Sequence, residues 1–262
     1  MLLVIDVGNT NIVMGVFQSD RLVASWRVRT EYNTTEDEFN VLAAGLFAQS
    51  GIRFNQIRKT IISSVVPPMV TILDGFSRKY LGHTPHWIDA KSYPGMPILY
   101  SNPNEVGPDR IVNGVAAYHR HRSSLIVIDF GTATTFDVID DHGNYCGGVI
   151  APGINLSLEA LHQAAAKLPR VAITRPKRVI GKSTVPAMQA GIFWGYVGLI
   201  EGLVVRIRKE YAGEHGDGAN MQVIATGGLA PLFADSSSVI KVSDVTLTLD
   251  GLQSIYRRNR PR

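Results

Sequence analysis

The chain begins Met1-Leu-Leu-Val-Ile-Asp6-Val-Gly8-Asn9-Thr10-Asn11, and a similar stretch, Leu125-Ile-Val-Ile-Asp129-Phe-Gly131-Thr132-Ala-Thr134-Thr135, follows in the middle. In each, an apolar β-rich run ends at an aspartate, a glycine follows two residues later, and small hydroxyl or amide residues form the turn into the next predicted strand. Glycine lets a ligand approach the backbone, Asn and Thr supply hydrogen-bond donors, and the aspartate can hold a divalent cation or its water. Two copies, 129 − 6 = 123 residues apart, favour a repeated phosphate-binding hairpin over two ordinary hairpins.

The order of the predicted elements is also repeated in the two halves of the chain. In the first half, three strands precede an amphipathic helix that begins at a Thr35 and Glu38 capping box, and a buried strand and a second helix follow. This repetition predicts an α/β fold with two similar domains, residues 1–118 and 119–262, each with a mixed sheet flanked by helices. The active site is expected in the cleft between the domains. The predicted strands are 2–7, 11–17, 21–29, 59–65, 124–129, 134–139, 144–150 and 221–225, with further helices after Pro68, after Gly153 and over 185–211.

The composition indicates a globular protein. Of the 262 residues, 45% are hydrophobic and 18% are charged, which is enough apolar material for a large core in one or two domains. Asp6 interrupts the apolar N-terminus, and the longest nearly uncharged stretch, 183–200, contains Pro186 and Gln189. Neither a signal peptide nor a membrane span is therefore predicted. We expect a water-soluble, cytoplasmic protein that does not bind a membrane.

The net charge of +4 does not by itself predict a nucleic-acid partner. Part of it lies in the arginine run between 257 and 262, interpreted as a frayed, solvated tail, and the basic cluster 119–122 is interpreted as an exposed helix end, with phosphate binding as the alternative. No zinc spacing or nucleic-acid-binding signature is present, so no nucleic acid is expected. The single cysteine, Cys146, is interpreted as a small buried side chain. Gly181-Lys182-Ser183 does not end a Walker loop, because position 176 is proline.

Seven motifs, in order along the chain, resemble a known family. The doubled Asp-x-Gly hairpins and the late Thr-Gly-Gly resemble the superfamily of acetate kinases, sugar kinases, heat-shock proteins and actin, and so imply an actin-like ATPase, ribonuclease H-like fold. Within it, the chain resembles the type III pantothenate kinases over essentially its whole length. That family uses ATP to phosphorylate the terminal hydroxyl of pantothenate to 4'-phosphopantothenate, the first step of coenzyme A synthesis. The motifs are Asp6-Val-Gly-Asn-Thr-Asn11, Ser63-Ser-Val-Val-Pro67, Tyr100, Gly107-Pro-Asp-Arg110, Asp129-Phe-Gly-Thr-Ala-Thr-Thr135, Gly147-Gly-Val-Ile-Ala-Pro-Gly153 and Thr226-Gly-Gly228.

The resemblance implies roles for individual residues. The first hairpin would bind the β- and γ-phosphates of ATP, with Mg²⁺ held by Asp6 through water, and Asp129 would bind a monovalent cation, K⁺ or NH₄⁺. The alternatives are structural: turn-forming residues in both hairpins, a packing tyrosine at Tyr100 and a helix N-cap at Thr184. The implied ATP-binding residues are Asp6, Val7, Gly8, Asn9, Thr10, Asn11, Ile12, Val13, Thr132, Gly227 and Gly228, and the implied pantothenate-binding residues are Tyr100, Gly107, Pro108, Asp109, Arg110 and Thr184.

Asp109 is the candidate catalytic base. An alcohol is a poor nucleophile unless its proton is accepted as the new bond forms, and a carboxylate within hydrogen-bond reach can accept it. The guanidinium of Arg110 offers a planar fork of donors that matches the carboxylate of pantothenate. The alternative is an ordinary helix start with an aspartate near its N-cap; the two interpretations are compatible, because a helix start also favours anions.

Two other functions remain open. One is another small-molecule kinase of the same superfamily. The other is a degenerate relative that binds a ligand and regulates transcription or a partner. Such a relative is expected to have lost one of Asp6, Asp109 and Asp129, and all three are present.

The helix predicted after Pro186 has an unusual glycine pattern. Glycines in a helix interior each cost about 1 kcal/mol relative to alanine, so several of them indicate that another backbone comes close. We expect this helix to be buried nearly all round, either by a contact within the chain or by a homodimer interface. The resemblance favours the homodimer. The glycines are Gly191, Gly195, Gly198 and Gly202, and the large apolar residues among them are Phe193, Trp194, Tyr196 and Leu199.

Overall fold

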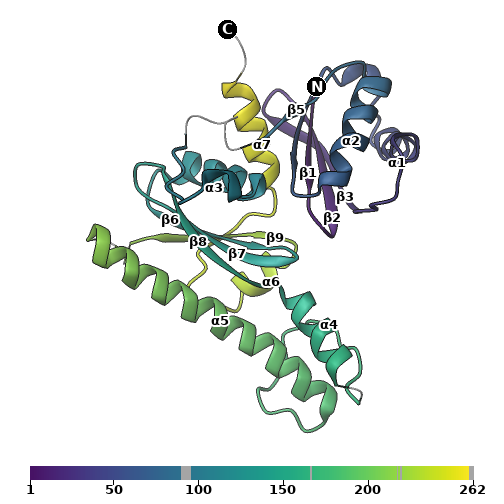
Figure 1. Ribbon diagram of the computed structural model, residues 1–262. Coiled ribbons are helices and arrows are strands. Elements are labelled where there is room, and N and C mark those ends of the chain that lie inside the picture. The colour runs from purple at the N-terminus through teal and green to yellow at the C-terminus, as the bar shows by residue number, and fades with distance from the viewer. Residues whose placement is uncertain (90–95, 166, 217, 219, 260–262) are drawn as a thin grey trace. The chain divides into compact units, whose positions relative to one another are not determined.

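The computed structural model describes residues 1–89, 96–165, 167–216, 218 and 220–259. The chain forms two compact units, each built around its own sheet (Figure 1). The first unit contains Met1–His119 together with Thr246–Arg262, and the second contains Arg120–Val245.

The sheet of the first unit has the strand order β3-β2-β1-β4-β5. The central strand β1 pairs antiparallel with β2, which pairs antiparallel with β3, and on its other side β1 pairs parallel with β4. The sheet is therefore mixed, with a hairpin meander on one side and a crossover on the other. The strands are β1 (Leu2–Val7), β2 (Asn11–Gln18), β3 (Arg21–Arg29), β4 (Lys59–Ser64) and β5 (His86–Trp87).

The sheet of the second unit repeats this arrangement. Its order is β10-β9-β6-β7-β8, with the β6, β7 and β8 meander antiparallel and the β6–β9 and β9–β10 pairs parallel. The two predicted mixed sheets and the repeated element order are thus confirmed. The strands are β6 (Leu125–Phe130), β7 (Ala133–Ile139), β8 (Tyr145–Pro152), β9 (Gln222–Gly227) and β10 (Val242–Ser243).

The two helices predicted after the third and fourth strands are present and pack on the first sheet. The C-terminal helix of this unit was not predicted from the sequence. At the start of α1 the capping box is present: the Thr35 hydroxyl oxygen accepts from the backbone of Glu38 at 3.2 Å, and the Thr35 backbone donates to the Glu38 carboxylate at 2.8 Å. The second predicted helix continues beyond α2 as a π-helical turn to Leu81. The helices are α1 (Glu36–Gln49), α2 (Pro67–Phe76), α3 (Pro108–His121) and α7 (Leu247–Arg258), with short 3₁₀ turns at Phe54–Gln56 and Pro103–Glu105.

The C-terminal helix α7 belongs to the first unit, although the sequence placed residues 119–262 together in the second domain. Its apolar face, with Leu249, Leu252 and Ile255 buried, packs on β1 and β4. Because this contact joins the two ends of the chain, no local pattern predicts it. The interpretation of the terminal arginines as a frayed tail is wrong for Arg257, which lies in α7 and forms an ion pair with Asp20; residues 260–262 lie outside the described residues.

The long helix α5 (Thr184–His215) packs one face on the second sheet. In the chain it follows α4 (Ile154–Ala164) and precedes α6 (Ala230–Ala234). Phe193, Ile200 and Val204 on this face are fully buried. The sequence predicts that this helix is buried nearly all round. In the single chain, however, part of its surface is exposed. The glycines Gly191, Gly195 and Gly198 are exposed, and a Cβ atom added to any of them would meet nothing within 4 Å.

One described helix, residues Thr184–Glu214, is long and apolar enough to cross a membrane by length and composition. In its most apolar window 39% of the residues are buried inside the protein. Core helices of water-soluble proteins also pass this test, so the finding is weak evidence for a membrane span.

The contact between α7 and α3 predicts how substitutions of glycine change the free energy of unfolding. A Cβ atom added to Gly251 would lie 2.5 Å from the carbonyl oxygen of Val112, whereas one added to Gly45 in α1 would meet nothing within 4 Å. Gly251→Ala should lower the free energy of unfolding by about 1 to 3 kcal/mol through overpacking. Gly45→Ala should raise it by up to about 1 kcal/mol, because alanine is the better helix former. Urea unfolding of both variants tests this, and a stabilising Gly251→Ala would contradict the packing described.

Candidate active site

The first hairpin lies at the carboxyl end of β1. Asp6 is the next-to-last residue of this strand and stands between Val13 of β2 and Ser63 of β4 in the register. The turn after it is closed by a hydrogen bond from the Gly8 amide to the Asn11 carbonyl at 3.0 Å. Asn9 and Thr10 at the tip of the turn are exposed, so a ligand can reach them.

The carbonyl groups of this turn are held on one side by the segment after β3. The hydroxyl of Thr30 donates to the Gly8 carbonyl at 2.6 Å, the hydroxyl of Tyr32 to the Asn9 carbonyl at 2.7 Å, and the Thr30 amide to the Thr10 carbonyl at 3.0 Å. In a planar trans peptide the N–H points opposite to the C=O. The N–H of each of these three peptide groups therefore points away from the group that bonds its own carbonyl, and amides left available in this way suit an anion.

Thr30 and Tyr32 were not identified from the sequence. Their bonds to the turn span 22 and 23 residues, and nothing in the spacing of the two side chains marks them. A weak signal in the sequence is that both residues closely follow β3, the strand that pairs with β2 of the hairpin.

Asp109 and Arg110 form the start of α3. The Asp109 carboxylate accepts the backbone N–H of Arg110 at 2.9 Å, and the Gly107 carbonyl accepts the N–H groups of Arg110 and Ile111. The predicted helix start is therefore present. Arg110 is only 7% exposed, and arginine is seldom buried to this degree without charged or polar surroundings.

A chain of contacts brings Asp109 to the same end of the first sheet as the hairpin. The Cβ position of Gly107 lies 2.5 Å from the Asp109 carboxylate and 3.7 Å from the side chain of Val65. Val65 follows β4 directly, and its amide donates to the carbonyl of Val7, the last residue of β1, at 3.1 Å. Two of the predicted site elements thus meet within one unit.

The second hairpin places oxygen atoms around Asp129. Asp129 of β6 stands opposite Thr135 of β7, so their side chains share one face of the sheet. The Thr135 hydroxyl donates to the carboxylate of Asp137 at 3.0 Å, and Asp137 is fully buried. Because a carboxylate only accepts, the Thr135 oxygen keeps its lone pairs for a cation or a water. Thr135 and Asp137 were not identified from the sequence.

Gly227 closes the other side of this hairpin. It has φ +88°, and a Cβ atom there would lie 2.7 Å from both the Asp129 carboxylate and the Phe130 carbonyl, so only glycine fits. The Thr132 carbonyl in turn accepts the amide of Gly153 at 3.2 Å. The structure therefore brings Gly227 against Asp129, and Thr132 lies in the turn between β6 and β7.

Tyr100 and Thr184 lie outside the two hairpins along the chain. Tyr100 is in an irregular segment before α3, and the residue is 36% exposed. Thr184 is the exposed first residue of α5, and Ser183 occupies the N-cap, so the alternative interpretation of Thr184 as an N-cap is wrong.

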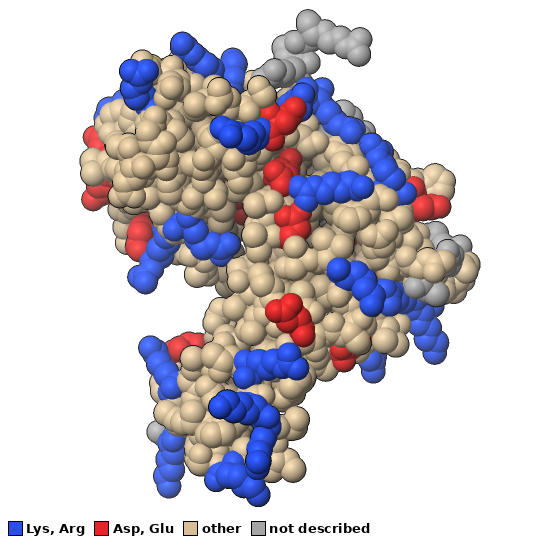
Figure 2. All heavy atoms as spheres, turned by 180° about the vertical axis from the view of Figure 1, so that it is seen from behind, with Lys and Arg blue, Asp and Glu red and all other residues tan. Residues whose placement is uncertain are grey.

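Lys and Arg side chains gather around the end of the second unit at which α5 begins (Figure 2). They belong to the segment before α5 and are Lys167, Arg170, Arg175, Lys177, Arg178 and Lys182.

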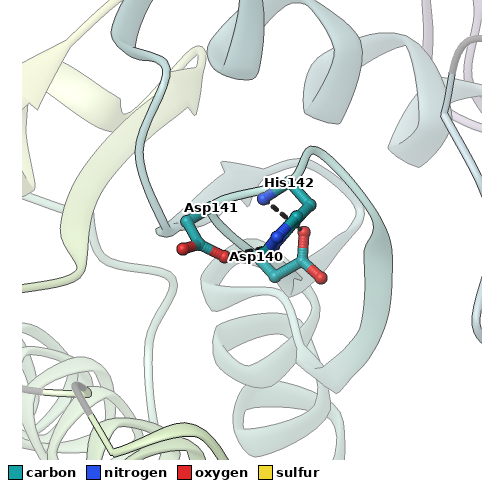
Figure 3. A group of neighbouring side chains, drawn as sticks. All are labelled: Asp140, Asp141 and His142. Atoms are coloured by element: carbon teal, nitrogen blue, oxygen red, sulfur yellow. Dashed lines mark hydrogen bonds and ion pairs between the residues drawn. The ribbon is translucent and has the colours of Figure 1, made fainter.

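Among the described residues, the one group of three potential metal ligands is Asp140, Asp141 and His142 in the turn between β7 and β8 (Figure 3). The Asp140 carboxylate accepts the backbone amides of His142 at 3.0 Å and Asn144 at 2.7 Å, as well as the Asn144 side chain. These bonds are those of an aspartate that caps its own turn. We therefore interpret this group as structural.

Cys146 is half-buried on β8, and its thiol is expected to be unreactive. Burial, and secondly the negative charge of Asp140, raise the pKa of the Cys146 thiol to about 11. The reactive thiolate is scarce at neutral pH under these conditions. This agrees with the interpretation of Cys146 as a packing residue.

Comparison with known proteins first gives the fold class. The crystal structure of MreB 5 of Spiroplasma citri bound to AMPPNP is similar, with a TM-score of 0.57 at 9% identity, over 98% of this chain and 96% of that chain. Together with the two mixed sheets flanked by helices, this likeness defines an actin-like ATPase fold of the ribonuclease H-like type.

The sequence comparison gives the family. The family model for type III pantothenate kinase matches residues 2–206. The type III pantothenate kinase of Desulfatibacillum aliphaticivorans is 57% identical over 98% of each chain, and that of Rhodospirillum rubrum is 54% identical over the full length of both. The chain belongs to the type III pantothenate kinase family.

Proposed function

We propose that this protein transfers the γ-phosphoryl group of ATP to the terminal hydroxyl of pantothenate in the cytoplasm. The product is 4'-phosphopantothenate, and the reaction is the first step of coenzyme A synthesis. The observation that supports this most directly lies in the first unit. There a turn whose three carbonyl groups are held by Thr30 and Tyr32 lies at the same end of one sheet as the Asp109–Arg110 pair.

The first hairpin binds the β- and γ-phosphates of ATP through its backbone amides. The span concerned is Asp6 to Val13, and its tip is held rigid by Thr30 and Tyr32. Asp6 is a single carboxylate at the strand end, which suits Mg²⁺, because this ion usually takes one or two carboxylates plus substrate phosphates and waters. When bound, Mg²⁺ neutralises charge on the phosphates.

Asp109 accepts the proton of the attacking hydroxyl. As the new oxygen–phosphorus bond forms, the bond between the γ-phosphorus and the bridging oxygen breaks, ADP leaves, and the hydroxyl proton passes to the Asp109 carboxylate. The backbone N–H of Arg110 already holds one oxygen of this carboxylate at 2.9 Å, which fixes its orientation. The Arg110 guanidinium binds the carboxylate of pantothenate, with Gly107 and Pro108 shaping the turn beside it.

The remaining predicted residues complete the two ligand sites in this proposal. Thr132, Gly227 and Gly228 take the phosphates and adenosine of the nucleotide, and Tyr100 and Thr184 contact pantothenate. The location of the active site between the two domains stays a prediction.

A substrate panel separates this proposal from the other two functions. The purified protein is mixed with ATP and Mg²⁺, and ADP release is followed with pantothenate, with hexoses, with acetate and with no acceptor. Release that depends on pantothenate alone is expected. Release with another acceptor would favour a different small-molecule kinase, and binding of ATP without turnover on any acceptor would favour a regulatory relative.

Asp109→Asn tests the base directly. The variant keeps the shape of the side chain and the bond from the Arg110 amide but cannot accept the proton, so kcat should fall by about two to four orders of magnitude. KM for pantothenate should change little, because Arg110 is intact. Asp74→Asn is the matched control, since Asp74 pairs with Arg78 on the surface of α2. Near wild-type kcat for Asp109→Asn would show that Asp109 is not the base.

The second hairpin is proposed to hold a monovalent cation. The Asp129 carboxylate and the Thr135 hydroxyl oxygen face the same side, and Asp137 fixes the direction of the Thr135 proton. Oxygen ligands of this kind suit a hard alkali cation, and NH₄⁺ can donate hydrogen bonds to them.

Activity should therefore need K⁺ or NH₄⁺ in addition to Mg²⁺. In matched ionic strength, K⁺ should also raise the melting temperature relative to Na⁺, because an ion that binds only the folded state stabilises it. Asp129→Asn should abolish both effects, and Asp141→Asn, an exposed carboxylate in the β7–β8 turn, should preserve them. Full activity and an equal melting temperature in Na⁺ alone would show that this site does not bind K⁺ or NH₄⁺ specifically.

The protein is further proposed to be a homodimer with α5 in the interface. Gly191, Gly195 and Gly198 face open space in the single chain, so no contact with another described residue explains their cost in helix stability. Val205 further along the same helix is 59% exposed. A second copy of α5 that approaches closely would bury this face.

Light scattering behind size exclusion tests the dimer. The wild type should have about twice the chain mass of 28.6 kDa. Gly195→Leu should shift the mass towards 28.6 kDa, because the added side chain blocks close approach, whereas Gly213→Leu near the end of the helix should leave the dimer intact. A wild type of 28.6 kDa, or a dimer unaffected by Gly195→Leu, would exclude α5 as the interface.

A further inference from the structure

A hollow lies in the first unit, at the opposite end of the sheet from the hairpin. It has a volume of about 390 Å³, within the range of about 300 to 1,000 Å³ of small-molecule sites. Its walls come from the starts of β1 and β4, the β2–β3 turn and one face of α7. Leu2 lines this hollow, four residues before Asp6, so the two sites are about 13 Å apart along β1.

The charges around this hollow are unbalanced. Arg58, Lys59 and Arg257 line it. Arg257 is paired with Asp20, but Arg58 and Lys59, both exposed, have no ion pair with any other residue that the structure describes. Two adjacent cations at the mouth of one hollow attract an anion, and a guanidinium beside an ammonium suits the several oxygens of a phosphate.

The rest of the lining adds an apolar floor and neutral polar groups. Phe17 and Leu2 are buried at the base, while Gln253 and Tyr256 of α7 face the same space. The Gln253 amide is directed by its bond to the Asp20 carboxylate at 3.0 Å. An anion with an apolar portion would therefore satisfy both parts of the lining.

We propose that this hollow binds a phosphorylated small molecule, with its phosphate on Arg58 and Lys59 and its apolar portion on Phe17 and Leu2. This binding site is separate from the proposed kinase site. Neither its residues nor its ligand take part in phosphoryl transfer.

Calorimetric titration with phenyl phosphate tests this site. The titration is done with AMPPNP and Mg²⁺ present at saturation, so that the hairpin is already filled. Saturable binding to the wild type is expected, and Arg58→Gln/Lys59→Gln should weaken it by about tenfold or more, as expected for the loss of charge-assisted hydrogen bonds. Arg27→Gln, an exposed arginine on β3, is the matched control and should bind as the wild type does.

Two further titrations define the class of ligand that the hollow binds. Gln253→Glu replaces the amide that bonds Asp20 by a second carboxylate and should also weaken phenyl phosphate binding. Benzoate should bind more weakly than phenyl phosphate, because it has fewer oxygens and less charge. No saturable binding to the wild type, equal binding to wild type and double variant, or equal affinity for benzoate would overturn the proposal. Kinase activity of the double variant should be unchanged, so failure of this site and failure of the proposed reaction are distinguishable.

Discussion

The central strand of each sheet has one antiparallel and one parallel neighbour, and this pairing determines where the candidate groups lie. The antiparallel neighbour of β1 creates the hairpin turn, and the parallel neighbour β4 ends at the same edge. Because Val65, which follows β4, lies close to Gly107, the residue before α3, Asp109 is placed near that edge as well. The second unit repeats the pairing with β6, β7 and β9, which brings Gly227 against Asp129.

This scaffold matches the demands of phosphoryl transfer, which are mainly positioning and charge neutralisation. Turn amides that are fixed by bonds on their carbonyl side cost little to reorganise when an anion arrives. Thr30 and Tyr32 supply those bonds from a neighbouring loop, outside the motif itself. We therefore regard them as positioning residues of the proposed nucleotide site.

Much of the fold could be predicted from the sequence, because its signals are local. Apolar runs that end in Asp6 and Asp129 mark the two central strands, and the Thr35 capping box marks the first residue of α1. The assignment of α7 to the first unit could not be predicted, since it depends on contacts between residues about 250 positions apart. The supports of the hairpins also escaped prediction. The partner of Thr30 is set by strand pairing, and nothing in the sequence marks the hydrogen bond between Thr135 and Asp137.

The central claim is that the terminal hydroxyl of pantothenate attacks the γ-phosphorus of ATP. Phosphorus NMR of the reaction with pantothenate labelled with ¹⁸O at this hydroxyl tests it most directly. The account predicts a phosphomonoester whose bridging oxygen is ¹⁸O, formed in equal amount with ADP. Unlabelled inorganic phosphate as the product, or a phosphoryl group on any other atom of pantothenate, would contradict it.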